Sequence, residues 1–264
     1  MDWEKELYDH GENPLDRLVD GYSYTSVFRK IAFVGDSLSS GEFETCEKDG
    51  KKHYYDLFEY SWGQYIARKN GLLAYNFSKG GMTTKQYIES FAESRGFWDA
   101  DKACQAYVMA LGVNDILNNR VSELGSIEDV DFDDYKNNKP TFSGYYAAII
   151  QRYKEISPDA KFFFVVMPRS TDAEKCRKIE QVSGVLYDFA QRFDNAYVID
   201  LYRYGPVYDE RFKHNFYMYN HMSPAGYIFT ARMIDSYIDY IVRTNPDDFR
   251  TVGFIGTDIK YKYD

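Results

Sequence analysis

The sequence has few cysteines and no long apolar run. Cys46, Cys104 and Cys176 are widely spaced among 264 residues. Such a set does not suit a disulfide framework and offers no close pair for zinc, so we expect reduced thiols. No segment approaches the roughly 18 apolar residues of a transmembrane helix, and the opening MDWEKELYDHGENPLDR contains no apolar signal segment. These absences favour a cytoplasmic protein without integral membrane contact, and they leave open an export signal that has been removed.

Positive charge is also in short supply. Lysine and arginine number 32 against 41 acidic residues, which gives a formal net charge of −9. This balance argues against nucleic acid and anionic membranes as the main partners. Aromatic residues, by contrast, are plentiful, with 26 tyrosines and 19 phenylalanines. Tyrosine can bury its ring and keep its hydroxyl in water, so the composition is compatible with an aromatic-lined cleft, although an aromatic core accounts for most of these residues.

Short apolar segments alternate with helical patterns along the chain. The predicted strands are Ile31–Gly35, Leu73–Phe77, Ala106–Leu111, Phe162–Met167 and Ala196–Ile199. The predicted helices run from the cap Ser61 through Lys69, from the cap Thr141 to Pro158, over 173–193, and from the cap Ser223 with Pro224 in the first helical position. Alternating strands and helices imply βαβ units and a parallel sheet.

The fold class that follows is α/β, a three-layer α/β/α sandwich. We expect a single domain over residues 1–264, with a core at about 28–243 and extensions at 1–27 and 244–264. In such folds ligands bind beyond the carboxyl ends of the strands. The residues that carry chemistry are therefore expected where strands pass into loops.

Two polar segments interrupt the alternation. Glu42–Glu59 reads as an insertion with a turn at Lys48–Lys51, and Asn118–Lys139 is a long acidic loop. Because the second segment follows directly on a candidate site residue, Asn114, we expect it to form a wall or lid. A calcium site within Asp129–Asp134 is the alternative, but this run lacks the glycine and terminal glutamate of an EF-hand loop.

Small and polar residues follow each of the first three strands. Gly35-Asp36-Ser37-Leu38 places a serine on a tight turn after the first strand, and Gly80-Gly81 follows the second strand. Gly112-Val113-Asn114-Asp115 follows the third strand, where the asparagine can donate to an oxyanion and Asp115 can anchor the loop. Each block alone is typical of a turn. A phosphate loop is the rival interpretation of the glycine pair, but the required spacing is missing.

One histidine completes the pattern. His221 lies in a short loop immediately before the last predicted helix. The ordered set of serine, glycine, asparagine and histidine blocks resembles the SGNH, or GDSL-type, hydrolases from about Ile31 to Tyr240. The resemblance implies a flavodoxin-like fold and ester hydrolysis without a metal or organic cofactor.

The resemblance also implies roles for the matching residues. Ser37 would be the nucleophile and His221 the general base. The backbone N–H groups of Ser37 and Gly81 and the side chain of Asn114 would form the oxyanion hole. We expect Ser37 Oγ within hydrogen-bond reach of His221 Nε2.

The sequence departs from the family in one place. The family usually has an aspartate three residues before the histidine, and this chain has Met218 there. We therefore predict that a main-chain carbonyl orients His221. The alternative is a carboxylate recruited from elsewhere, with Asp209, Glu210 and Asp200 as the candidates.

Several functions remain open on these residues. The leading one is a serine esterase acting on a small acyl ester or an acetyl ester of a carbohydrate, and acyl transfer to another alcohol would use the same residues. The alternative from another class is a non-catalytic carbohydrate-binding or structural module that retains the fold. A nucleotide-binding protein is disfavoured by the missing phosphate-loop spacing. The sequence gives no oligomeric state.

Overall fold

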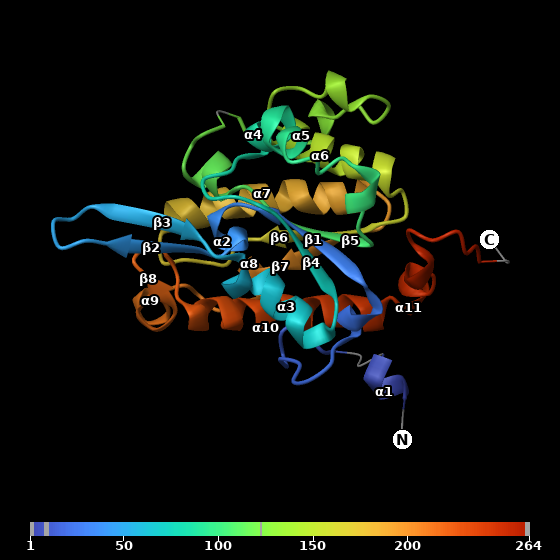
Figure 1. Cartoon of the computed structure of the whole chain (residues 1–264), viewed down its shortest axis with the longest axis horizontal. Helices are drawn as coiled ribbons and strands as arrows, with labels where there is room; N and C mark the ends of the chain where they lie inside the picture. The colour runs from blue at the N-terminus through green and yellow to red at the C-terminus, as the bar shows by residue number, and fades with distance from the viewer. Residues whose placement is uncertain (1–2, 8–10, 122, 262–264) are drawn as a thin grey trace.

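The computed structural model describes residues 3–7, 11–121 and 123–261, and a five-stranded parallel sheet forms its centre (Figure 1). The order of the strands across the sheet is β4-β1-β5-β6-β7. This is the flavodoxin-like order, so the predicted fold class is confirmed. Each strand matches its predicted segment to within one residue at each end: β1 Lys30–Gly35, β4 Leu73–Ser78, β5 Ala106–Ala110, β6 Lys161–Val166 and β7 Ala196–Asp200.

Helices cover both faces of the sheet, as Figure 1 shows. One layer contains α4 (Thr84–Gln86), α5 (Ala92–Ser94), α6 (Phe142–Ile156) and α7 (Ala173–Arg192). The other contains α3 (Trp62–Asn70) and α10 (Pro224–Thr244). The predicted caps are present, because the side chains of Ser61, Thr141 and Ser223 each accept an N–H three residues along.

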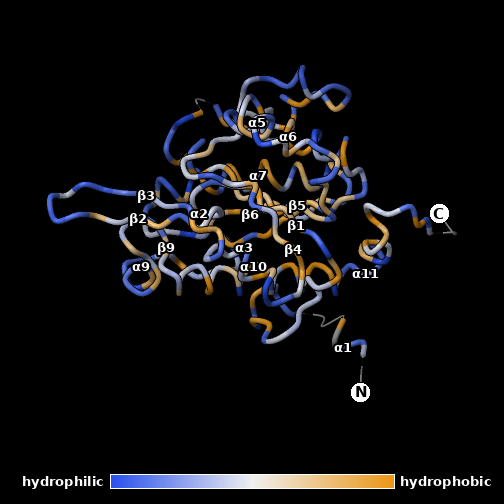
Figure 2. The backbone as a smooth tube through the Cα atoms, viewed as in Figure 1, coloured by the Kyte–Doolittle hydropathy of each residue, from blue (hydrophilic) through white to orange (hydrophobic). Residues whose placement is uncertain are grey.

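The strands separate two hydrophobic cores. Alternate residues of β1 face opposite sides, so Ala32 and Val34 pack toward α6 and α7 while Ile31 and Phe33 pack toward α3 and α10. All four are completely buried. In Figure 2 the central strands are accordingly hydrophobic, whereas the hairpin that projects beyond the sheet is hydrophilic toward its tip. Burial on both faces fixes where each strand ends, and hence where the following loop begins.

The smaller elements lie around this sandwich. Two of them, β2 and β3, pair as an antiparallel hairpin within the predicted insertion Glu42–Glu59, and β8 and β9 form a second short pair. Their bounds, with those of the short helices, are α1 Glu4–Leu7, α2 Ser37–Ser40, β2 Glu42–Cys46, β3 Lys52–Asp56, α8 Leu201–Tyr204, α9 Glu210–Phe216, β8 Tyr217–Met218, β9 His221–Met222 and α11 Pro246–Phe249.

Parts of both predicted extensions contribute to the packing. Phe249 of α11 is buried against Phe28 and Phe163, with edge-on and stacked ring contacts. At the other end of the chain, the hydroxyl of the buried Ser23 donates a hydrogen bond to Asp235 Oδ1 of α10, at 2.7 Å. The segments outside 28–243 therefore include core residues. The polar composition of the two ends of the chain gives no sign of them. The three cysteines are free thiols, as expected.

Candidate active site

Ser37 stands at the carboxyl end of β1, where the sequence places it. Asp36 caps α2 by accepting the Leu38 N–H at 3.1 Å, and Ser37 is the first residue of the helix. Its side chain is half-buried. Within the described residues, Ser37 Oγ has no hydrogen-bond partner, so the hydroxyl is not committed to the protein interior.

The glycine and asparagine blocks meet beside this turn. Asn114 Nδ2 donates to Met82 O at 3.1 Å and lies 3.3 Å from Asp36 Oδ2. Asp115 Oδ1 accepts from both N and Oγ1 of Thr84, at 2.8 and 2.6 Å, and so anchors one loop to the other. Three loops from three strands thus converge at one edge of the sheet, around the buried Asp36.

Burial dominates the electrostatics of Asp36. Loss of solvation raises the pKa of its carboxyl to about 7, an effect that the Leu38 N–H opposes. The nearby charges of Asp115 and Glu42 also raise this pKa, and His221 lowers it. Asp36 therefore changes charge near neutral pH while holding the amide of Asn114.

His221 lies between two carboxylates, both supplied by the hairpin. Its Nδ1 is 3.2 Å from Glu44 Oε2, and its Nε2 is 2.9 Å from Glu42 Oε1. The ring of Tyr54, on β3, packs edge-on against the imidazole with 5.9 Å between ring centres. The prediction that a main-chain carbonyl orients His221 is therefore wrong, because the Glu44 side chain occupies that position.

Glu44 is held firmly for this task. Its side chain is fully buried, its Oε1 is 2.6 Å from Lys52 Nζ, and its Oε2 accepts the Asn220 N–H at 3.1 Å. Burial alone would raise the pKa of Glu44, but hydrogen bonds from Lys52, His221 and Asn220 outweigh it and lower the pKa. Glu44 therefore stays ionised beside Nδ1.

Glu42 approaches the other face of the site. A Cβ placed on Gly80 would lie 1.9 Å from Glu42 Oε2, so the carboxylate packs directly against this glycine and would have to shift if a side chain were added there. The side chain bridges His221 and the glycine loop, and in this arrangement Nε2 contacts Glu42 rather than Ser37. Burial lowers the pKa of His221, but the two glutamates outweigh this effect and raise it. Because both ring nitrogens face carboxylates, the geometry fits an imidazolium.

The three carboxylates proposed from the sequence serve other purposes. Asp209 caps α9, Glu210 pairs with Lys213 on that helix, and Asp200 caps α8 and accepts the Tyr187 hydroxyl. The signal for the true partner lay in Glu42-Phe43-Glu44, where alternation on a strand puts both glutamates on one face. The sequence shows only a polar insertion after the nucleophile block, and nothing in it indicates that a glutamate of this insertion contacts a histidine 177 residues further along the chain.

Most of the acidic segment Asn118–Lys139 lies away from the site. At its start, Arg120 Nη1 donates to Gly81 O at 2.8 Å. Residues 123–139, by contrast, pack on α6, where Glu123 O accepts the Phe142 N–H and the Asp129 side chain contacts Thr141 and Lys139. The expectation of a wall or lid therefore applies only to the first few residues, because the rest forms a cover over α6.

The calcium alternative has no support from the acidic run. Asp131 Oδ1 accepts the N–H groups of Asp133 and Asp134, so this carboxylate stabilises its own turn. Among residues 3–7, 11–121 and 123–261, no three His, Cys, Asp or Glu side chains cluster as a metal site. In the same residues, no helix is both long and apolar enough to span a membrane.

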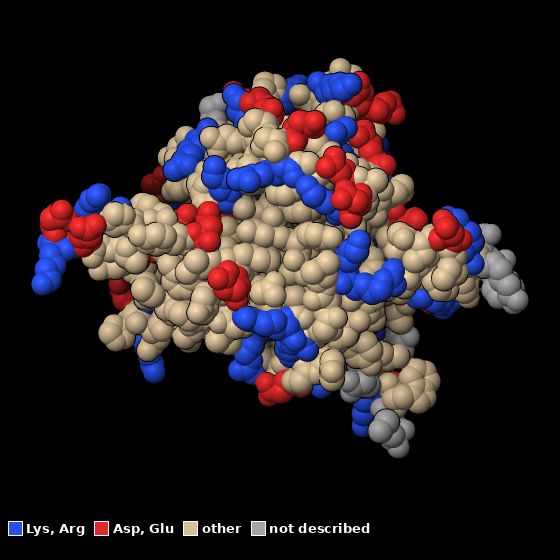
Figure 3. Space-filling view, viewed as in Figure 1, with Lys and Arg blue, Asp and Glu red and all other residues tan. Residues whose placement is uncertain are grey.

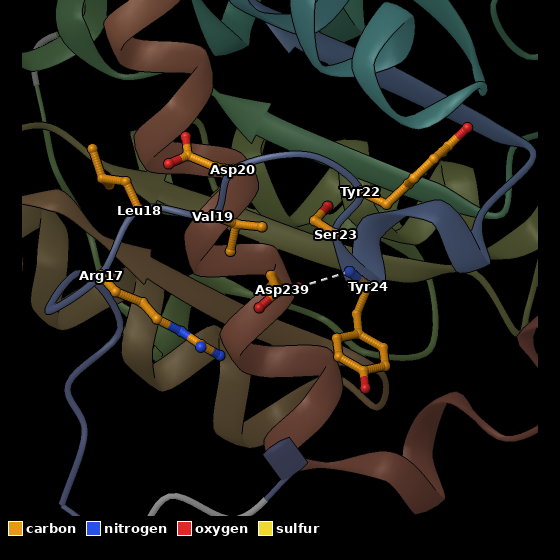
Figure 4. A pocket seen from close by; sticks show the side chains of 8 residues that line it. All are labelled: Arg17, Leu18, Val19, Asp20, Tyr22, Ser23, Tyr24 and Asp239. Atoms are coloured by element: carbon orange, nitrogen blue, oxygen red, sulfur yellow. Dashed lines mark hydrogen bonds between the residues drawn. The ribbon is translucent and has the colours of Figure 1, made fainter. Parts of the chain in front are cut away.

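Two cavities bear on the search for a substrate site. One of about 430 Å³ opens beside Gly80 and Gly81. A larger one of about 530 Å³ lies against α10 beneath residues 17–24 (Figure 4), where the backbone N–H of Tyr24 donates to Asp239 at 2.7 Å. Its lining includes none of the four predicted blocks, so the smaller cavity is the one that adjoins the candidate chemistry.

Comparison with known proteins agrees with the geometry. The model of the GDSL-like lipase/acylhydrolase family matches residues 33–228, which is most of the chain. The chain belongs to this family. The sheet edge where Ser37 and the loops of Gly81 and Asn114 meet is therefore the candidate active site, and His221 approaches it through Glu42. No curated protein matches the sequence.

Solved structures of esterases share the fold of this GDSL-like hydrolase. A family two carbohydrate esterase from Clostridium thermocellum, in complex with cellohexaose, aligns with a TM-score of 0.56 and 19% identity over 86% of this chain and 67% of that one. An acetyl xylan esterase, AlAXEase, gives 0.51 and 16% over 79% and 99%. A family two carbohydrate esterase from Corynascus thermopiles gives 0.54 and 14% over 83% and 67%.

Proposed function

We propose that this GDSL-like hydrolase cleaves carboxylic esters with Ser37 as nucleophile, His221 as general base and Glu44 as the residue that orients the base. The single observation that carries the proposal is the 3.2 Å contact between the buried Glu44 and His221 Nδ1. A carboxylate at Nδ1 selects the tautomer whose Nε2 can accept a proton, and it stabilises the imidazolium that forms. Glu44 thus supplies what the absent aspartate at position 218 would supply.

The proposed reaction passes through an acyl-enzyme. Ser37 Oγ attacks the acyl carbonyl while its proton passes to His221 Nε2, and the oxyanion accepts hydrogen bonds from the backbone N–H groups of Ser37 and Gly81 and from Asn114 Nδ2. His221 then returns the proton to the departing alcohol, and water repeats the sequence to release the acid. Two groups have to move first: Glu42 must turn away from Nε2, and the Asn114 amide must turn from Met82 O.

The surroundings of His221 support a small acyl or acetyl ester of a carbohydrate as substrate. Tyr54 packs against the imidazole, and Tyr219 lies two residues before His221 in the chain. The two tyrosines are 52% and 63% exposed. Exposed rings can pack on the apolar face of a sugar while their hydroxyls remain in water.

The nucleophile can be tested by labelling. The folded protein is treated with a fluorophosphonate, the adduct is located by mass spectrometry, and turnover of p-nitrophenyl acetate is measured in parallel. We expect an adduct at Ser37, and we expect Ser37→Ala to lose the adduct and lower turnover by about 10⁴- to 10⁶-fold. Ser39→Ala is a matched control in the same helix, because it removes a hydroxyl that has no hydrogen-bond partner.

The opposite result has a defined meaning. A folded protein that gives neither adduct nor turnover contradicts the esterase proposal and favours the non-catalytic carbohydrate-binding module. An adduct at another serine, with Ser37→Ala still active, contradicts the assigned nucleophile while retaining hydrolysis.

A further inference from the structure

The cavity beside the glycine loop has a distinctive set of walls. One wall is the loop itself, and another is the polar stripe Gln86, Ser90 and Ser94, which recurs every four residues along the continuous helical segment from α4 to α5. Arg120 closes the far side. The complete lining is Lys79, Gly80, Gly81, Met82, Gln86, Ser90, Phe91, Ser94 and Arg120.

This lining is positively charged in a protein whose net charge is −9. It contains two cations, Lys79 and Arg120, and no acidic side chain. In the described part of the chain, neither cation forms an ion pair. Figure 3 shows basic side chains in a band across this face, between the sheet and the α4–α5 segment. The charge at the cavity is therefore available to a ligand.

Hydrogen-bond donors are arranged around the opening. Arg120 is tied to the mouth by the 2.8 Å bond from Nη1 to Gly81 O, which leaves its other N–H groups for a ligand. Thr83 Oγ1 lies 3.3 Å from Gln86 Oε1, so the amide nitrogen of Gln86 is the end left for the cavity. Lys79 Nζ lies 5.9 Å from the centre of the Phe91 ring, on the same wall.

The acidic groups nearest to this charge lie outside the lining of the cavity. The buried Asp115 interacts with Arg120 from the protein interior. Glu42 contacts Gly80 from the side of His221, where its Oε1 lies 2.9 Å from the imidazole Nε2. Glu89 and Glu93 are exposed on the α4–α5 segment but do not line the cavity.

We propose that this cavity is a subsite for a negatively charged group, such as a carboxylate, carried by the ester substrate. The inference rests on the proposed function, because it places the charged group next to the oxyanion donor Gly81. Arg120 would bind the anion through its remaining guanidinium N–H groups and Lys79 through its ammonium. The charged group belongs either to the acyl part or to the alcohol part of the ester, and the test distinguishes the two.

Two pairs of esters provide that test. Mono-p-nitrophenyl succinate and p-nitrophenyl acetate differ by a carboxylate on the acyl side, whereas 4-acetoxybenzoate and phenyl acetate differ by one on the alcohol side. We expect kcat/KM for the charged member of one pair to exceed that of its neutral partner by about tenfold after correction for their uncatalysed rates, with the advantage shrinking as salt is added. Lys79→Gln and Arg120→Gln should each remove most of it.

Matched variants separate charge from disturbance of the loop. Lys85→Gln removes an exposed lysine from α4 that does not line the cavity, so it should leave both ratios unchanged. If Arg120→Gln acted only through Gly81, it would slow both members of a pair equally and leave the ratio intact. The ratio therefore reports the subsite rather than the oxyanion hole.

Binding provides a readout without turnover. Calorimetry with Ser37→Ala should show the charged ester binding about tenfold more tightly than the neutral one, and the further change Lys79→Gln should abolish the difference. Equal affinities and equal kcat/KM within both pairs, or ratios that Lys79→Gln and Arg120→Gln leave untouched, would overturn the subsite. Absence of turnover with charge-selective binding intact would instead count against the proposed esterase.

Discussion

The edge of the parallel sheet and the β2–β3 hairpin contribute to the same site, but different forces hold them. At the sheet edge, Ser37 follows a strand that is buried from Ile31 to Gly35, so its position is set by core packing. On the hairpin, Tyr54 and Tyr55 are about half exposed, and the hairpin contacts the site through the buried Glu44, which pairs with the exposed Lys52 on one side and with His221 on the other. The nucleophile thus depends on the core, whereas the orientation of the base depends on ion pairs from an insertion.

Replacing the hairpin's inner carboxylate should break this arrangement most severely. In Glu44→Gln the amide can donate to Nδ1 and so select the tautomer with a proton on Nε2, which cannot accept one from Ser37. We expect kcat/KM for p-nitrophenyl acetate to fall by up to about 10⁴-fold, as tautomer reversal does in serine proteases. Steady-state kinetics on protein shown to be folded by circular dichroism provides the measurement.

Three amide substitutions elsewhere are matched controls for that change. Asp209→Asn, Glu210→Gln and Asp200→Asn each alter a carboxylate that serves a local structural purpose. Each should leave ester turnover within about tenfold, because no charge partner of His221 is removed. A larger fall in one of these than in Glu44→Gln would reassign the partner of the base.

The contrast also explains which features the sequence could reveal. Strands such as Phe162–Met167 are continuously apolar because both faces are covered, so pattern alone located them to within a residue. Parallel strands have their carboxyl ends at the same edge of the sheet, so the residues that follow them can be predicted to lie near one another without any distance being known. The same logic predicts Ser37, Gly81 and Asn114 at one edge, and their loops do meet around Asp36. His221 approaches this edge through Glu42 instead of contacting Ser37.

The partner of His221 lay beyond that logic. Glu44 reaches the site because β2 lies next to β9, where its side chain contacts His221. Neither hydrophobic period nor strand order determines such a placement. The long segment Asn118–Lys139 shows the same limit, since its polar composition gave no hint that residues 123–139 would cover α6. Local pattern predicts elements, whereas the docking of a polar insertion depends on specific pairs of atoms.

Removing a donor from the sheet edge should have an intermediate effect. We expect Asn114→Ala to lower kcat for p-nitrophenyl acetate by about 10²- to 10³-fold with a smaller change in KM, because the lost hydrogen bond is made to the oxyanion of the transition state. Single-turnover and steady-state kinetics can separate the two parameters. The loss should be smaller than in Ser37→Ala; a change in KM alone would show that Asn114 contacts only the ground state.

The smallest effect is expected from the hairpin's outer carboxylate, and it should appear in the pH profile. Both glutamates raise the pKa of His221, so the base stays protonated, and inactive, to a higher pH than an ordinary histidine. In Glu42→Gln one of those charges is removed, the pKa falls, and Nε2 becomes free to accept a proton from Ser37. The acid limb of kcat/KM should therefore move to lower pH, with a gain of about tenfold or less on the acid side and little change on the plateau.

Glu42→Asp is the matched control, because it keeps the negative charge and shortens the side chain, whereas Glu42→Gln removes the charge and keeps the size. An unmoved acid limb would contradict the competition between Glu42 and Ser37 for Nε2, and a plateau reduced as far as in Glu44→Gln would show that Glu42 also takes part in the reaction.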